Sequence, residues 1–399
     1  MPDPASLGQH MHDAAVEMAK RGHRVLVLTA RRGYNDPSRI YERRELRHDV
    51  HIRRFGLSSF GKRSIAVRLL AQTIFLIQAV ARALFVRRLG GVLISTSPPM
   101  GPAAAVLIGM IRRVPVAYWA MDLNPDQLIV LGTLTKRSPV ARFFEALNRM
   151  ILRRAASVVA LDRYMAQCLE AKTPVGDRMH VLPVWPHVEA AAQPVPHGQN
   201  PFRAEHALNG RFVFMYSGNH GIALPLATFL EAATRYKDEP NVAFVFIGDG
   251  IRKKEVDQTI QTHGMKNMFS LPYQPLETLT FSLSAADVHL VSMDDRMVGV
   301  IHPCKIYGAM AVGRPILLVG PAPSHLSDIV QEHRIGWHVH HGDVDGAASL
   351  IDTIRKTDPT ELQAMGQRAR EAVLGRFSKS ILCKQFCDTI EEGFQATNS

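Results

Sequence analysis

Two glycine-containing loops in the second half of the chain carry groups that can bind phosphate. One loop follows the apolar run FVFMYSG and contains Gly218, Asn219 and His220. The other follows the run NVAFVFIGDG, in which Gly248 comes directly after the last apolar residue. Glycine lets a backbone approach a ligand closely, and successive amides in such a loop can donate to a diphosphate. An ordinary tight turn remains the alternative interpretation of the first loop.

Two basic residues stand near the start of helices that follow such loops. Arg252 opens the triplet RKK, where cations oppose the helix dipole unless an anion lies nearby. Lys305 falls in the first turn of the helix predicted from about Cys304, where its ammonium can meet a phosphate. Solvated charge is the alternative for Arg252, and a surface lysine is the alternative for Lys305.

A third group of polar residues follows an apolar strand in the first half of the chain. The segment YWAMDLNPDQ places Asp122, Asn124 and Asp126 after that strand, where a carboxylate can orient or deprotonate a hydroxyl group. An Asx turn or a helix cap explains Asn124 and Asp126 equally well. Asp122, nearest the strand end, is therefore the candidate catalytic residue.

The elements that position these residues alternate between helix and strand along the whole chain. Apolar runs such as RVLVLTA, GVLISTS and PVAYWAM alternate with amphipathic stretches, and the pattern restarts after a Pro-rich segment at 183–201. Such alternation is typical of parallel, doubly wound sheets. We therefore expect two Rossmann-like domains, a linker and a final helix that can return to the first domain, with bounds 1–185, 186–205, 206–378 and 379–399.

Composition narrows the class of protein. The chain has 399 residues, a formal charge of +11 and four cysteines at spacings that fit no disulfide framework or metal site. The run of His338, His340 and His341 has the pattern of a strand end entering a turn, so we expect no metal. The first twenty residues lack a signal-peptide core, which favours a cytoplasmic location. No recognition motif accompanies the basic residues, so we expect no nucleic-acid partner.

The first domain opens unusually. Pro2, Pro4, Ser6 and Gly8 read as loop residues, with helix signals from Gln9 onward. A doubly wound domain normally opens with a buried strand that feeds such a turn. We therefore expect the first sheet to lack its first strand, as in a chain that is truncated or whose start is misassigned.

Two helical stretches combine apolar and basic residues. The segment 64–86 is long and apolar, with Arg68 and Arg82 as its only charges, and it fits a core helix, an interfacial helix or a membrane span. The segment 135–155 pairs Phe143 and its apolar neighbours with several arginines. Contact with anionic lipid suits both segments, and a solvated basic face over a core-facing stripe is the alternative for the second.

Taken together, the motifs resemble the GT-B glycosyltransferases of family four, especially bacterial enzymes of capsule, O-antigen and exopolysaccharide assembly. The carriers are PASLGQHMHDAAVEMAKRGHRVLVLTARRGY, AMDLNPDQ, YSGNHG, FIGDG, SLPYQPLETLTFSLSAADVHLVS and HPCKIYGAMAVGRPI. The resemblance implies a GT-B fold, retention at the anomeric carbon, no metal and no cofactor besides the nucleotide-sugar donor. The second domain would bind that donor, with Gly8 on a loop approaching from the first domain. Tyr273 and its neighbours lie where the family holds the base, and His302 opens the last carrier segment, so both join the donor-binding candidates.

Three departures separate the chain from many of these relatives. Val300 and Gly308 replace two glutamates spaced by seven residues in many relatives, and Asn219 and Leu224 replace an Arg and a Lys that clamp the diphosphate. Met121 stands where an acceptor-side histidine is common. The resemblance thus implies a subfamily in which Lys305, helped by Arg252, supplies the missing positive charge.

These expectations combine into one functional hypothesis. The enzyme would move a hexose or N-acetylhexosamine from a nucleotide sugar, most simply a UDP-sugar, to a lipid-linked or polysaccharide acceptor. A polyprenyl-diphosphate-linked saccharide is the expected acceptor, at the inner membrane surface with its anionic lipid. The alternatives are a GT-B sugar-nucleotide epimerase and a catalytically silent membrane-associated binding subunit.

Overall fold

The computed structural model describes residues 6–33, 38–56, 65–186 and 194–398, which fold into two compact units. Each unit layers helices against sheets in which all strand pairs but one are parallel, which confirms the predicted α/β fold class. The first unit comprises Met1–Val184, Gly299–His302 and Ser380–Ser399; the second comprises Trp185–Val298 and Pro303–Lys379. The chain thus enters the first unit three times.

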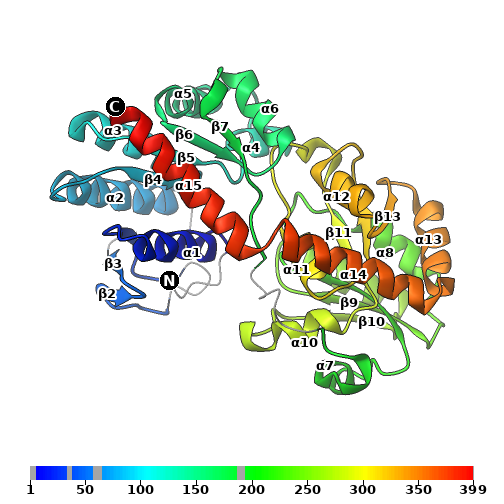
Figure 1. The fold of residues 1–399 in the computed structure, drawn as a ribbon. Coiled ribbons are helices and arrows are strands. Elements are labelled where there is room, and N and C mark those ends of the chain that lie inside the picture. The colour runs from blue at the N-terminus through cyan, green and yellow to red at the C-terminus, as the bar shows by residue number, and fades with distance from the viewer. Residues whose placement is uncertain (1–5, 34–37, 57–64, 187–193, 399) are drawn as a thin grey trace. The chain divides into compact units, whose positions relative to one another are not determined.

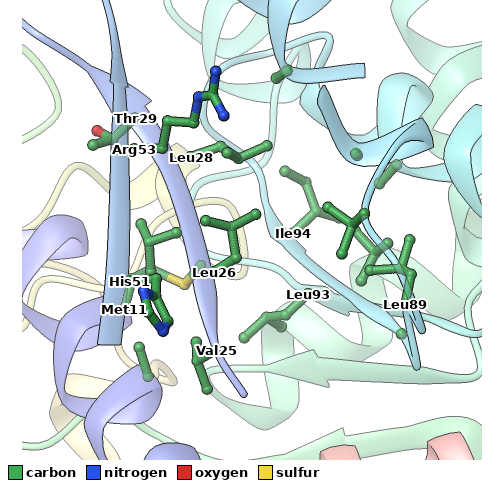
Figure 2. Close-up of a pocket in the computed structure, with 18 of the residues that line it drawn as sticks. Met11, Val25, Leu26, Leu28, Thr29, His51, Arg53, Leu89, Leu93 and Ile94 are labelled. Atoms are coloured by element: carbon green, nitrogen blue, oxygen red, sulfur yellow. The ribbon is translucent and has the colours of Figure 1, made fainter. Parts of the chain in front are cut away.

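The strands of the first unit form two separate sheets among the described residues (Figure 1). The first has the order β1-β3-β2, with β1 at Leu26–Ala30, β2 at Arg44–Arg47 and β3 at Val50–Phe55. The second has the order β4-β5-β6-β7, with bounds Val92–Ser95, Val116–Trp119, Ser157–Ala160 and Met179–Val181. Within the described part of the chain, β1 pairs only with β3 and β4 only with β5, so β1 and β4 are each an edge strand of their sheet (Figure 2).

Helices cover both sheets of the first unit (Figure 1). They are α1 (Ser6–Lys20), α2 (Ile65–Leu84), α3 (Gly101–Arg112), α4 (Asp126–Val130), α5 (Pro139–Arg154), α6 (Arg163–Lys172), the short η1 (Gly176–Arg178) and α15 (Lys379–Asn398). Their starts follow ordinary capping chemistry: the Ser138 hydroxyl accepts from the Ala141 amide at 3.2 Å, and Pro139 needs no hydrogen-bonded amide in the first turn. The apolar residues of β5 and β6 are fully buried beneath them.

Two expectations about these helices change. The loop assigned to Gly8 is wrong, because α1 already begins at Ser6 and includes Gly8. Glycine costs a helix roughly 1 kcal/mol relative to alanine, so it weakens a helix without preventing it. The membrane-span interpretation of segment 64–86 is not supported, since no helix among the described residues is long and apolar enough to cross a bilayer.

The final helix is held to α1 by charged contacts within the first unit. The guanidinium of Arg21 lies 2.7 Å from Asp388 and 2.6 Å from Glu391, and His23 lies 2.5 Å from the other Glu391 oxygen. Figure 1 shows α15 crossing beside α1. The last twenty residues therefore belong to the first unit although they follow the second in sequence.

The second unit contains one six-stranded parallel sheet with the order β10-β9-β8-β11-β12-β13. The strands are β8 (Phe212–Ser217), β9 (Val242–Ile247), β10 (Met268–Leu271), β11 (Val288–Ser292), β12 (Ile316–Val319) and β13 (Gly336–Val339). The covering helices are α8 (Ala227–Thr234), α9 (Lys253–His263), α10 (Leu279–Ser284), α11 (Lys305–Ala311), α12 (His325–His333), α13 (Val344–Lys356) and α14 (Pro359–Gly375), with short turns η3 (Leu276–Thr278) and η4 (Asp295–Met297). Strand order reverses between β8 and β11, which is the switch point where open α/β sheets bind ligands.

The segment expected to form a linker is partly folded into the second unit. Residues 187–193 lie outside the described residues. Further along the segment, η2 (His197–Gln199) and α7 (Pro201–Glu205) are short helices. Phe202 is buried in an apolar cluster, and the Arg203 guanidinium donates to the carbonyls of Ala285 and Leu208 at 2.6 and 2.8 Å. Residues 197–205 therefore pack against the second unit, although their prolines had indicated a linker.

Candidate active site

Lys305 is the centre of a polar cluster at the switch point of the second unit. Its Nζ lies 3.5 Å from the centroid of the Tyr216 ring and 3.3 Å from the carbonyl oxygen of Asn219. A Cβ placed on Gly218 would lie 3.6 Å from the Lys305 Cε, so the glycine and the lysine are in close proximity. Three predicted donor-binding residues, Gly218, Asn219 and Lys305, are thus brought together although 86 positions separate the last two.

Burial changes the proton affinity of this lysine. Removal from water lowers the pKa of Lys305 to about 7, an effect that the neighbouring Cys304 only partly opposes. The face of the Tyr216 ring and the Asn219 carbonyl are neutral partners, so neither neutralises a full positive charge. A phosphate oxygen would do so, and the site is therefore suited to an anionic ligand.

The loops that carry the other candidates are tied to one another through their backbones. The Gly218 amide donates to Ile247 O at 2.9 Å, and the His220 amide donates to Asp249 O at 2.8 Å. Gly248 has φ +129°, and a Cβ there would collide with the Gly218 carbonyl. The close approach thus requires glycine at this position. Of the three amides expected to donate to a diphosphate, those of Gly218 and His220 are already engaged, which leaves the amide of Asn219.

His220 and Tyr216 form the buried wall behind Lys305. Both side chains are fully buried, their rings lie 4.8 Å apart, and the Tyr216 hydroxyl donates to Asn219 O at 2.7 Å. Burial, reinforced by the nearby Lys305 and Lys253, lowers the pKa of His220 to about 4, so the imidazole is neutral near pH 7. The sequence indicated His220 only as an amide donor, whereas its ring supports the tyrosine that faces the lysine.

Arg252 and Tyr273 flank the cluster in different ways. The Arg252 guanidinium donates to Ile222 O at 2.9 Å and pairs with Glu255 at 2.8 Å, so it braces the loop after β8. Tyr273 is 53% exposed, and both residues interact electrostatically with Tyr216. Partial burial raises the pKa of Tyr273, which keeps its hydroxyl protonated and able to donate. Tyr273 is therefore the more available of the two for contact with a ligand.

The candidate residues in the first unit gather after β5. The Asp122 amide donates weakly to the Thr96 hydroxyl at 3.4 Å, and the Leu123 amide donates to Val300 O at 2.9 Å. Asp122 is an exposed residue, yet protein atoms crowd its carboxyl enough to raise its pKa, an effect that His302 partly offsets. Asp122 thus combines access to solvent with an increased affinity for a proton.

His302 has a buried carboxylate partner that sequence reasoning missed. Its Nδ1 lies 2.7 Å from an Asp162 oxygen, and both side chains are nearly inaccessible to solvent. The other Asp162 oxygen accepts from the Met165 amide at 2.9 Å and so caps α6. A separation of 140 residues hid this pair, since the only local signal was an Asp at a helix start. His302 is thus placed in the first unit, although the sequence suggested a donor-binding role.

The side chain of Asp126 has a structural partner, and the backbone of Asn124 is bonded to α5. Lys172 lies 2.8 Å from Asp126 and 2.6 Å from Glu145, and the Asn124 carbonyl accepts from Asn148 at 2.6 Å. These bonds tie the segment after β5 to α5 and α6. Asp122 is exposed, and among the described residues it forms no ion pair, whereas Asp126 is paired with Lys172. Asp122 therefore remains the candidate carboxylate of this segment.

Comparison with known proteins identifies the family. The model described as "Glycosyl transferase 4-like domain" matches residues 7–185, and the model described as "Glycosyl transferases group 1" matches residues 199–372. The chain belongs to the GT-B glycosyltransferases of family four. A probable glycosyltransferase of Pseudomonas aeruginosa, WbjE, is 29% identical over 321 residues, 78% of this chain and 76% of that protein. WcaI of Escherichia coli K12, described as a putative colanic acid biosynthesis glycosyl transferase, is 25% identical over 53% of this chain and 52% of its own length.

Solved structures share the fold of this glycosyltransferase. Anabaena HepE in complex with UDP and glucose superposes with a TM-score of 0.74 and 15% identity, covering 98% of this chain and 97% of that one. Sucrose-phosphate synthase of Thermosynechococcus elongatus superposes with a TM-score of 0.76 and 16% identity, covering 98% of this chain and 94% of that one. Similarity at this identity establishes the GT-B architecture, and the chemistry follows from the residues of the chain itself.

The structure shows where Val300 and Gly308 lie, the two positions at which many relatives carry glutamate. Gly308 lies within α11, where an added Cβ would meet Leu283 at 3.6 Å, and Val300 belongs to the segment that bonds to Leu123 in the first unit. Neither position carries a carboxylate. Lys305 is a basic group that lies beside Gly218 in the loop after β8.

Proposed function

We propose that this glycosyltransferase transfers a hexosyl or N-acetylhexosaminyl group from a UDP-sugar to a lipid-linked or polysaccharide acceptor, with retention at the anomeric carbon, in bacterial surface polysaccharide synthesis. The observation that carries the proposal is Lys305 Nζ, held 3.5 Å from the Tyr216 ring beside Gly218 at the switch point of the second unit. Relatives named for colanic acid synthesis support a polysaccharide acceptor. The HepE complexes with UDP and with UDP-glucose support a UDP-sugar donor.

The proposed chemistry is stabilisation of a departing diphosphate. As the bond between the sugar and the phosphate breaks, negative charge grows on the diphosphate oxygens, and a cation already in place lowers the barrier. Lys305 supplies that cation, and the amide of Asn219 supplies a neutral donor beside it. The rest of the rate enhancement then comes from holding the donor sugar and the acceptor hydroxyl in the reactive geometry, without a covalent enzyme intermediate.

Asp122 is proposed to orient the acceptor hydroxyl. Its raised pKa means that the carboxyl holds a proton more readily than an ordinary aspartate. A carboxyl of this kind can exchange hydrogen bonds with a hydroxyl group while the departing phosphate accepts the proton. Asp122 would in that case position the acceptor, and its loss would lower kcat more than it raises the donor KM.

The reaction is proposed to need neither a divalent metal nor a further cofactor. In many transferases a metal ion neutralises the diphosphate, and here Lys305 would supply that charge. A chelator should then leave turnover unchanged, whereas a loss of activity that Mg²⁺ or Mn²⁺ restores would reject this part of the proposal.

We propose that two neighbouring helices of the first unit make the membrane contact. On α3, Leu107, Met110 and Ile111 are 47%, 55% and 55% exposed, and on the adjacent α5, Val140 and Phe143 are each 50% exposed. Helix α5 also carries four arginines, two of them in its last turn. Apolar side chains rimmed by cations suit the headgroup region of an anionic bilayer, where a lipid-linked acceptor would lie.

The function is tested by transfer from a panel of radiolabelled UDP-sugars to lipid-linked saccharides, followed by NMR of the product anomer. Lys305→Met should lower kcat/KM by about 100-fold or more, since it removes a preorganised donor that stabilises the charge developing in the transition state. Lys266→Met, which removes an exposed lysine of the same unit, is the matched control and should be neutral. An inverted product, or equal rates in the two variants, would reject the proposal.

A further inference from the structure

A short segment from the second half of the chain is built into the first unit. Residues Gly299–His302 belong to that unit, although the residues on both sides of them in sequence belong to the second. Val300, Ile301 and His302 are all buried. This inserted segment, residues 299–302, is therefore held inside the first unit by contacts along its length, and each of them has an identifiable chemical basis.

Gly299 fits the start of the inserted segment against α6. Its φ of +73° lies in the left-handed region that favours glycine. A Cβ at this position would lie 2.6 Å from the Tyr164 carbonyl oxygen and 2.7 Å from the Cys168 sulfur, two atoms of α6. Both distances are shorter than van der Waals contact, so the backbone passes α6 more closely than any residue with a side chain allows.

His302 anchors the other end of the inserted segment. Its Nδ1 lies 2.7 Å from an Asp162 oxygen, with side chains that are 1% and 7% exposed. Asp162 is itself fixed, because its other oxygen accepts from the Met165 amide at 2.9 Å at the start of α6. A hydrogen bond to a carboxylate is stronger than one between neutral groups, and low-dielectric surroundings strengthen it further. The buried pair therefore joins the inserted segment firmly to α6.

Between these two ends, the inserted segment supports the loop that carries Asp122. The Val300 carbonyl accepts from the Leu123 amide at 2.9 Å, whereas the Asp122 amide donates to the Thr96 hydroxyl at 3.4 Å. The shorter of these two bonds is thus the one that the inserted segment makes. Burial raises the pKa of Asp122 and His302 acts in the opposite direction, so the imidazole is also close enough to influence this carboxyl.

We propose that Asp162 and His302 are positioning residues for Asp122: the buried pair holds the inserted segment, and the inserted segment holds the Asp122 carboxyl in place for the acceptor hydroxyl. This inference rests on the proposed function, in which Asp122 orients the acceptor. Asp162 and His302 act through Asp122, because their own side chains are buried. Their loss should lower turnover and leave donor binding at Lys305 unchanged.

Asp162→Ser breaks the pair and keeps the cap of α6. Serine caps a helix about as well as aspartate, but its side chain is one bond shorter and does not reach the imidazole. Asp343→Ser is the matched control, because Asp343 caps α13 of the second unit through the amide three residues further on, as Asp162 does in α6. Any difference between the two variants then reports the contact with His302.

Hydrogen exchange tests the support of the loop without any substrate. The Leu123 amide should exchange about tenfold faster or more in Asp162→Ser and at the wild-type rate in Asp343→Ser. The Ala120 amide, which donates to β6 at 2.8 Å, is the reference and should be unchanged in both. Unchanged exchange at Leu123, or equal acceleration at Ala120, would overturn the proposal.

A second pair of variants makes the same comparison if Asp162→Ser does not fold. His302→Asn keeps an amide donor near the position of Nδ1, so it should keep exchange at Leu123 slow. His302→Leu removes the donor and should accelerate that exchange. Equal exchange rates in the asparagine and leucine variants would contradict the proposed role of the hydrogen bond to Asp162.

A double-mutant cycle tests whether the pair acts through Asp122. Asp162→Ser should lower kcat for sugar transfer about tenfold or more and leave the Kd for UDP within about twofold of the wild-type value. In an Asp122→Asn background the same substitution should change kcat by less than about twofold, because the residue that it positions is already lost. Losses that multiply in the double variant would overturn the proposal.

The two experiments separate this inference from the function on which it rests. Absence of transfer by the wild-type protein, or an unaltered rate in Asp122→Asn, would reject the proposed function, and exchange at Leu123 would still decide whether the pair holds the loop. Transfer that depends on Asp122 but is unaffected by Asp162→Ser would leave the proposed function intact and reject the positioning role.

Discussion

Binding of UDP beside Lys305 is expected to carry a proton into the site. With a pKa of about 7, the lysine of the free protein is roughly nine-tenths neutral at pH 8 and roughly nine-tenths charged at pH 6. A bound diphosphate favours the charged form and returns the pKa toward its ordinary value. Binding should therefore take up about 0.9 proton at pH 8 and about 0.1 proton at pH 6.

The same linkage sets the pH dependence of affinity. Only the charged lysine binds the diphosphate well, so the apparent Kd should rise about fivefold from pH 7 to pH 8 and approach tenfold per unit above that. From pH 7 to pH 6 the apparent Kd should fall by a further factor of about two, and below pH 6 the lysine contributes little further change. In the ligand-free protein the sign is opposite, because the folded state loses this proton near pH 7 while the unfolded state keeps it, so stability rises with pH above 7.

Isothermal titration calorimetry in buffers of different ionisation enthalpy measures the proton number directly. The terminal phosphate of UDP itself titrates near pH 6, so Lys305→Met is the reference from which that contribution is subtracted. The variant should bind UDP about 10- to 150-fold more weakly, the loss of one charged hydrogen bond. A proton number near zero at pH 8, or the same number in both proteins, would refute the assignment of Lys305 as the diphosphate ligand.

Four further outcomes follow from the same structure. Gly248→Ala should destabilise the second unit by at least about 2 kcal/mol in urea unfolding, because its Cβ meets a carbonyl, whereas Gly198→Ala, with open space around it, should be neutral. Lys172→Met should cost the first unit about 2–3 kcal/mol, because two carboxylates lose a buried partner; a wild-type melting curve would contradict this. The buried His289 has a pKa lowered to about 4, so the second unit should lose stability as pH falls from 6.5 to 4, and His289→Met should flatten that loss in acid titration. Phe143→Asp should reduce sedimentation with phosphatidylglycerol vesicles and leave UDP affinity unchanged, whereas unchanged sedimentation would remove α5 from the membrane contact.

The fold could be predicted because it depends on local patterns. Short apolar runs such as Val242–Ile247 are fully buried strands, and the amphipathic stretches between them are helices. The start of α1 was misjudged because Ser6 and Gly8 suit a turn as well as a first helical turn. The segment at 197–205 was misjudged because its prolines concealed the burial of Phe202.

The site could be predicted only in part, because long-range contacts decide which groups remain available. Glycine spacing and helix position indicated Gly218 and Lys305, which the structure brings together. The engagement of Arg252 with Ile222 and Glu255, and the bond between His302 and Asp162, depend on residues that no local pattern connects. The lowered pKa of Lys305 likewise arises from burial that only the folded chain creates.

A crystal structure of the chain with UDP tests the central claim most directly. A diphosphate oxygen should lie about 2.7–2.9 Å from Lys305 Nζ, with the Asn219 amide as a second donor. The Tyr216 ring should keep its place beneath the ammonium group. A diphosphate bound elsewhere, with Lys305 still directed only at the Asn219 carbonyl and the Tyr216 ring, would contradict this account of donor binding.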